Sequence, residues 1–177
     1  MKKIFASVLV AYLFLATTPS KLQAQFNLKK EIGKATESTK QGTKPQGDEL
    51  DERGKIVLQK FIDILLDPNF DAAAEKALQV IHKSDFNNSG EALKSDRLQF
   101  SFKKAWQNAK FYQNPIKITR VQKTSLSGIG FKDTAENGTS YKVWVGKKKG
   151  VNGMPAPIYV FFPAGGGEPK IHDYGSL

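Results

Sequence analysis

Two adjacent helical patterns decide the fold, in the stretch KIVLQKFIDILLDPNFDAAAEKALQVI, residues 55–81. Apolar residues recur at helical spacing over residues 56–66, and Pro68 ends that pattern because proline cannot continue a helix. Asp71 is a residue type that caps helix N-termini, so we expect a second helix that begins there and reaches Ile81. The three alanines after Asp71 would let this helix pack closely against the first.

Beyond this stretch the pattern changes from helical to alternating. Residues 98–109 still carry apolar side chains at helical spacing, which predicts a third helix. After Pro115 the apolar residues alternate with a period of two, which predicts strands. The expected strands are residues 116–123, 127–133, 139–147 and 156–162, with a short last strand over 170–174. Asn137-Gly138 is typical of a tight hairpin turn. Helices followed by such a meander predict an α+β fold, with N-terminal helices packed on an antiparallel sheet of four to five strands.

The first 24 residues have the composition of a secretory signal peptide. Lys2 and Lys3 precede an apolar run over residues 4–16, and a polar stretch that ends in a small residue follows, so we expect cleavage after Ala24. The apolar run is shorter than the roughly 20 residues that a membrane-spanning helix requires. We therefore expect an exported protein with no transmembrane segment after cleavage.

The next segment, residues 25–54, is rich in Lys, Glu, Thr, Gln and Gly and poor in large apolar residues. Such a segment cannot bury enough surface to offset the entropy lost on ordering. This predicts a flexible linker over 25–54 and a folded domain over 55–177.

The charge and the cysteine content limit the compartment and the partners that we expect for the protein. The chain has no cysteine, which excludes disulfides and thiol chemistry. An exported protein without cysteine is typical of a bacterial periplasm or outer surface. The net charge is +10; loss of the signal peptide would remove three lysines and leave 24 basic against 17 acidic residues, or +7. This charge favours solubility or anionic partners. The run Lys147, Lys148 and Lys149 is the candidate anion-binding surface.

Few residues are candidates for catalysis. His82, Ser84 and Asp85 lie too close along the chain to converge as a triad, and a cation at the end of a helix suffices to explain His82. His172 and Asp173 would point to opposite faces of a strand. No His or carboxylate pair has metal-ligand spacing. We assign no catalytic residue, no metal and no cofactor.

The strands supply the candidate binding residues. Arg120 shares a strand face with apolar residues, where its planar guanidinium could hold an anion or extend past the edge of the core. Tyr159 and Phe161 share one face of a strand that is apolar on its other face as well. The candidate ligand-binding residues are Arg120, Tyr141, Trp144, Tyr159 and Phe161. Core or interface packing is the alternative explanation of the aromatic residues.

The segments FIDILL (residues 61–66) and NFDAAA (residues 69–74) resemble the opening of secreted members of the NTF2-like, or cystatin-like cone, superfamily. In those proteins a later helix carries a Trp, as Trp106 would here. The resemblance covers residues 55–174 and implies a curved antiparallel sheet that encloses a cone-shaped pocket with its helices. Residues 82–95 are few for the hairpin usually found between the second and third helices.

Three functions remain open after this resemblance. We favour an exported, non-enzymatic envelope protein that binds a small ligand or a protein partner through its cone pocket or sheet face, because no base with a visible orienting partner is present. The alternatives are a pocket enzyme (isomerase, dehydratase or hydrolase) and a basic module that binds an anionic envelope polymer. Dimerisation through the sheet is common in such cones, which predicts a homodimer. No known motif interleaves basic and aromatic residues, which argues against nucleic acid.

Overall fold

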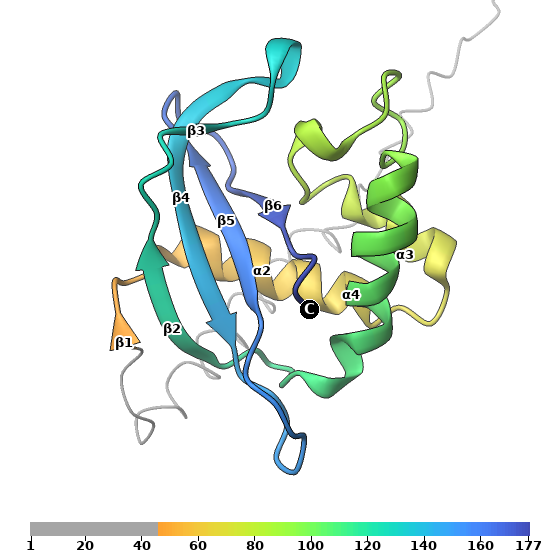
Figure 1. The fold of residues 1–177 in the computed structure, drawn as a ribbon, viewed down its shortest axis with the longest axis vertical. Helices are drawn as coiled ribbons and strands as arrows, with labels where there is room; N and C mark the ends of the chain where they lie inside the picture. Colours follow the sequence, from red (N-terminus) through yellow and green to blue (C-terminus); the bar gives the residue numbers. More distant parts are fainter. Residues whose placement is uncertain (1–45) are drawn as a thin grey trace, which may run out of the picture. The chain divides into compact units, whose positions relative to one another are not determined.

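A computed structural model describes residues 46–177 of the chain. The predicted signal peptide and residues 25–45 of the predicted linker lie outside the described residues. The helices are α2 (Glu52–Leu65), α3 (Phe70–Ala77), the π-helix η2 (Arg97–Phe102) and α4 (Lys103–Asn108). Short 3₁₀ turns are η1 (Lys83–Asp85), η3 (Ala109–Phe111) and η4 (Lys132–Thr134). The strands are β1 (Gln46–Gly47), β2 (Ile118–Lys123), β3 (Gly128–Ile129), β4 (Glu136–Val145), β5 (Pro157–Pro163) and β6 (Lys170–Asp173). The predicted α+β fold is confirmed (Figure 1).

The folded unit begins before residue 55. The Asp51 carboxylate caps α2 by accepting a hydrogen bond from the backbone N–H of Arg53 at 2.7 Å. Leu50 is buried against the core, and Gly47 pairs with Val121 of β2. A Cβ at Gly47 would lie 2.2 Å from the carbonyl oxygen of Val121, so this approach requires glycine. Residues 46–54, which the sequence assigned to the linker, therefore belong to the folded unit.

The second predicted helix is present, with different ends. α3 is capped by Asn69, whose side-chain oxygen accepts from the backbone N–H of Ala72 at 3.0 Å, and Asp71 lies inside the first turn. The helix ends at Ala77 because the following residues turn toward the sheet, where Ile81 bridges Ile171 of β6.

The third predicted helix is also confirmed, as the continuous column of η2 and α4. Its buried residues are Phe102 and Ala105, followed by Ala109. The indole N–H of Trp106 donates to the carbonyl oxygen of Asp67 at 2.7 Å, which ties this column to the end of α2.

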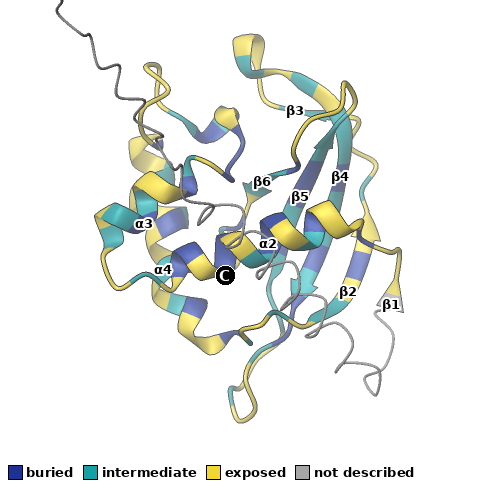
Figure 2. Ribbon diagram, turned by 180° about the vertical axis from the view of Figure 1, so that it is seen from behind, coloured by how far each residue is buried: buried dark blue, intermediate teal, exposed yellow. Residues whose placement is uncertain are grey.

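The sheet has the strand order β1-β2-β4-β5-β6, and β3 pairs with the start of β4. β1 runs parallel to β2, and the pairs β2–β4, β3–β4, β4–β5 and β5–β6 are antiparallel. Helix α2 crosses one face of this sheet, which we call the helix face (Figures 1 and 2). Its buried aliphatic side chains are Val121, Val143, Val145, Ile158, Val160 and Ile171. Figure 2 shows that buried residues gather in the strands and along α2.

Alternate residues of the same strands form the opposite face, which we call the outer face. Its members are Arg120, Gln122, Ser140, Lys142, Trp144, Tyr159, Phe161 and His172. The residues that alternate along β4 and β5, as predicted, therefore lie on two chemically different surfaces.

Two expectations about the strands are wrong. Asn137-Gly138 does not form a hairpin turn but lies inside β4, where Gly138 pairs with Pro163. A Cβ at Gly138 would lie 2.2 Å from the carbonyl oxygen of Phe162, so this glycine serves close strand approach. The strand expected over 127–133 is limited to β3, because the chain turns back through η4, where Lys132 has a φ of 51°. Among residues 46–177, no helix has the length and apolar character needed to cross a bilayer.

Candidate ligand-binding cleft

A cleft of about 900 Å³ lies over one end of the outer face. Its walls come from the segment 83–97, which joins α3 to η2, and from the arm 126–134, which carries β3 and η4. Figure 1 shows this arm extending from the end of the sheet toward the segment that follows α3. Tyr159, His172 and Asp173 contribute from the sheet.

His172 forms part of the cleft wall as a neutral imidazole. Its Nε2 hydrogen-bonds with the hydroxyl of the fully buried Ser140, at 2.5 Å. The ring packs edge-on against Tyr159, with centroids 5.5 Å apart. Burial lowers the pKa of His172 to about 4, so the side chain carries no charge at neutral pH.

His82 is a second buried imidazole, and its neighbours define its tautomer. Its Nδ1 accepts a hydrogen bond from the backbone N–H of Ser84 at 3.1 Å, so Nε2 carries the proton and donates to Glu136 Oε2 at 3.0 Å. Burial lowers the pKa of His82, although the hydrogen bond to Glu136 works in the opposite direction. His82 therefore caps η1 as a neutral acceptor. The predicted role as a cation at the end of the second helix is wrong, because α3 ends at Ala77.

Ser84, His82 and Glu136 are connected in the order that an acyl-transfer triad requires. The Ser84 hydroxyl lies 2.9 Å from His82 Nδ1. The same nitrogen, however, already accepts the Ser84 backbone N–H, so its lone pair is not free to remove a proton. His82 is also only 2% exposed. The arrangement accounts for the cap of η1, and we assign it no catalytic role.

An ion pair between a buried carboxylate and an exposed guanidinium forms part of the cleft lining. Asp85 Oδ1 is 3.2 Å from the Nε of Arg97, and Asp85 is only 3% exposed. Within residues 46–177, the other carboxylate oxygen of Asp85 has no hydrogen-bond partner. Burial raises the pKa of Asp85 to about 6, and the Arg97 guanidinium limits that rise. This carboxylate therefore changes charge close to neutral pH.

The rest of the cleft lining is mixed in charge and apolar at its lip. Cations and acids occur in nearly equal number: Lys83, Lys94, Arg97 and Lys132 against Asp85, Asp133 and Asp173. The ammonium of Lys94 donates to the carbonyl oxygen of Ser84 at 2.7 Å and so helps to hold η1. On the arm, Leu126 is 51% exposed and Phe131 is 76% exposed. The cleft thus combines polar groups with apolar side chains that are exposed to solvent.

Three of the sequence-predicted binding residues come together on the outer face. The Arg120 guanidinium lies 4.7 Å from the centre of the Trp144 ring. The ammonium of Lys142 lies 5.1 Å from the same ring and 5.6 Å from the ring of Tyr159. Tyr159 also lines the cleft, so the two surfaces adjoin.

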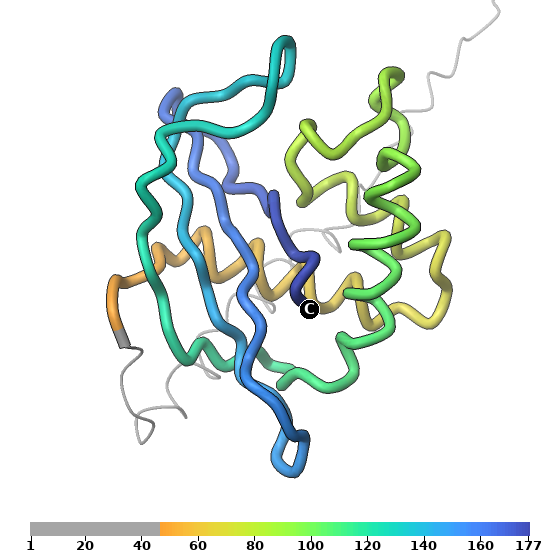
Figure 3. The backbone as a smooth tube through the Cα atoms, viewed as in Figure 1, coloured from red at the N-terminus to blue at the C-terminus, as the bar shows by residue number. Residues whose placement is uncertain are grey.

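The other predicted binding residues lie elsewhere. Tyr141 is on the helix face, with its ring 5.4 Å from that of Phe162. Phe161 is fully buried, 5.6 Å from the His82 ring. Lys147, Lys148 and Lys149 follow β4 in the loop that extends beyond the strand ends in Figure 3. Lys148 and Lys149 are exposed, whereas the Lys147 ammonium donates to the carbonyl oxygen of Asn152 at 3.1 Å.

Sequence reasoning missed the residues that the fold gathers from distant segments. His82 and Glu136 are 54 residues apart, and nothing in their local patterns links them. Within the described range, no three His, Cys, Asp or Glu side chains are arranged so that they could hold a metal ion. Comparison with protein-family models, with curated proteins and with solved structures gives no match to this chain.

Proposed function

We propose that this chain is an exported, non-enzymatic binding protein that holds a small ligand in the cleft over the outer face. The cleft is the observation that carries this proposal. Its volume of about 900 Å³ lies in the range of ligand sites in proteins, roughly 300–1,000 Å³. Polar side chains from three elements line it: Ser84 and Asp85 of η1, Arg97 of η2 and His172 of β6.

A cone of the NTF2-like type is part of the same proposal. The order of three helices before a meandering sheet supports it. So does the bridge between Phe86 and Leu93, which lies between α3 and α4 where the resemblance places a hairpin. The basic and apolar pattern of residues 1–24 supports export to a periplasm or an outer surface.

The lining indicates an amphipathic ligand. Phe86, Ile129 and Phe131 provide apolar surface, and the cations outnumber the acids of the lining by one. The imidazole of the lining, His172, is neutral at pH 7 because burial lowers its pKa to about 4. A ligand with an apolar body and a single anionic group fits these features best.

A fluorescent probe with both properties tests the proposal. We expect anilinonaphthalene sulfonate to bind the purified full chain saturably, with one probe per protein molecule. Phe131→Ser should weaken this binding about tenfold, because the probe can no longer cover the apolar ring at the lip.

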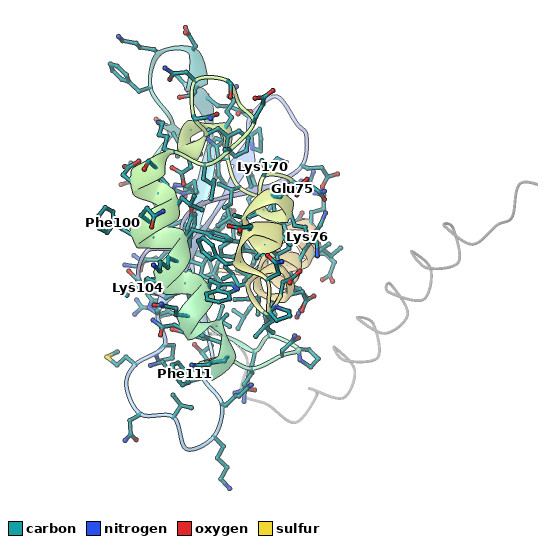
Figure 4. The ribbon with its side chains drawn as sticks, turned by 90° about the vertical axis from the view of Figure 1, so that its right-hand side faces the viewer. Glu75, Lys76, Phe100, Lys104, Phe111 and Lys170 are labelled. Carbon is teal, nitrogen blue, oxygen red and sulfur yellow. The ribbon has the colours of Figure 1, made fainter. Side chains whose placement is uncertain are left out.

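Phe100→Ser is the matched control. Phe100 is 74% exposed, close to the 76% of Phe131, but it lies on η2, points away from the body of the domain in Figure 4 and does not line the cleft. Its variant should bind the probe like the unchanged chain. Equal loss in both variants, or binding that does not saturate, would show that the probe reports exposed apolar surface and would overturn the proposal.

A further inference from the structure

Four side chains form a strip on the outer face that adjoins the cleft and shares only Tyr159 with it. Arg120 of β2 pairs in register with Trp144 of β4, and Lys142 of β4 pairs with Tyr159 of β5. The cations lie over the rings at 4.7 to 5.6 Å, as described above. We call these four residues the cation–aromatic strip.

The positive charge of this strip is not neutralised. In the described part of the chain, neither Arg120 nor Lys142 takes part in a salt bridge. The acid that the strand register brings nearest is Asp173 of β6, on the far side of Tyr159. The α2 helix covers the opposite face of the sheet (Figures 1 and 2). Within the strip, Arg120 is exposed, and the other three side chains are half-buried. A cation held over an aromatic ring stays available to a second, anionic group.

We propose that the cation–aromatic strip is a docking surface for an acidic polysaccharide. A guanidinium binds a carboxylate through two parallel hydrogen bonds, and Lys142 supplies a second charge on the neighbouring strand. Trp144 and Tyr159 offer apolar ring surface to the C–H groups of a sugar. A sheet face presents these groups in a plane, which suits an extended polymer, whereas the cleft is a concave site for a small molecule.

Charge also argues against a second copy of the chain as the occupant. In a dimer with a two-fold axis through this face, the same patch meets itself. Arg120 and Lys142 of one copy would then face the cations of the other, and like charges across an interface cost several kcal/mol. A polyanion complements the same surface without that cost.

Binding of a fluorescent oligogalacturonate, measured by anisotropy at low and at physiological salt, tests this proposal. The double variant Arg120→Gln/Lys142→Gln should lose about tenfold or more in affinity, and Trp144→Leu should lose affinity with no change in net charge. Dextran of similar length, which has no carboxylate, should not bind. Phe131→Ser, which tests the cleft, should leave this binding unchanged.

The control removes the same charge elsewhere. Lys148→Gln/Lys149→Gln deletes two exposed cations of the β4–β5 loop and should reduce affinity less than about twofold if the strip is the site. Thermal unfolding confirms that each variant is folded. Equal losses in the two double variants would show non-specific attraction and overturn the proposal. Tighter binding of a single-stranded oligonucleotide would also overturn it, as would a dimer in sedimentation that the Arg120→Gln/Lys142→Gln change disrupts.

Discussion

The two faces of the sheet are built from alternate residues of the same strands, yet they are stabilised differently. The buried strand residues of the helix face are all aliphatic, and each of the six is at most 1% exposed: Val121, Val143, Val145, Ile158, Val160 and Ile171. The buried side chains of the outer face include the polar Ser140, which is paired with His172. Packing alone therefore stabilises one face, whereas the other depends on hydrogen bonds and on protonation state. The proposed ligand cleft and the proposed docking strip both lie on the outer face.

Deleting bulk from the helix face should have the largest effect on stability. Ile158→Ala leaves a cavity in a fully buried site and should lower the free energy of unfolding by about 2–5 kcal/mol. Its neighbour Tyr159 points to the outer face, so Tyr159→Phe should change that free energy by less than about 0.5 kcal/mol. Urea unfolding of both variants measures the difference. Similar losses of unfolding free energy in the two variants would show that the two faces do not differ in their contribution to stability.

Acidification should change the free energy of unfolding in opposite directions through His172 and Asp85. The His172 pKa is about 4, below its ordinary 6.5, so the unfolded chain takes up this proton first and stability falls as the pH drops from 6.5 to 4. The Asp85 pKa is about 6, above its ordinary 3.8, so the folded chain takes up that proton first and stability rises as the pH drops from 6 to 4. Each contribution is on the order of 3 kcal/mol, and the two nearly cancel.

Single variants should therefore reveal opposite slopes. Asp85→Asn should lose stability more steeply on acidification than the unchanged chain, because the His172 contribution remains. His172→Gln should lose less stability or gain some, although His82 still favours higher pH because burial lowers its pKa. Unfolding free energies across this pH window test both slopes, and parallel curves would refute the assignment.

A smaller loss is expected where a buried hydroxyl on the outer face is removed. Ser140→Ala leaves His172 Nε2 without its hydrogen-bond partner and should cost about 1–2 kcal/mol of unfolding free energy. Ser125→Ala removes an exposed hydroxyl near the same sheet and should be neutral within about 0.5 kcal/mol. If both changes were neutral, the Ser140–His172 pair would contribute nothing to stability.

Local periodicity was enough to predict the helices, the antiparallel sheet and the sharing of one face by Tyr159 and Phe161. The predictions from periodicity were wrong where one sequence pattern fits two local structures and tertiary contacts determine which of them forms. Asn69 and Asp71 are both residue types that cap helices, but Asn69 has the extended backbone of a cap, and Asp71 lies inside the first turn. Gly138 matches a turn motif, but the close approach of Phe162 determines its use.

The candidate site could be predicted only in part. Trp144 and Tyr159 stood out as aromatic residues on strands, and Arg120 stood out because the alternation placed it on one face with the apolar Ile118. That shared face is wrong, because a β-bulge between Ile118 and Arg120 leaves Ile118 against the core and puts Arg120 opposite Trp144 on the outer face. Lys142 was missed because a lysine on a strand fits a solvated position equally well. Asp85 and Arg97 are brought together by an irregular segment with no periodic pattern.

The end of β1 at Gly47 has a consequence for the edge of the sheet. Within residues 46–177, β1 pairs with Arg120 and Val121 of β2, and after β1 ends the carboxylate of Asp48 accepts the backbone N–H of Lys123 at 2.6 Å. A side chain thus takes the hydrogen bond that a neighbouring strand would otherwise offer. The exposed side chains along this border include Lys117 and Lys123. A second copy of the chain that paired with this edge would find the Lys123 N–H already hydrogen-bonded, and its own lysines would be repelled by those of the first copy. Both effects disfavour edge-to-edge aggregation.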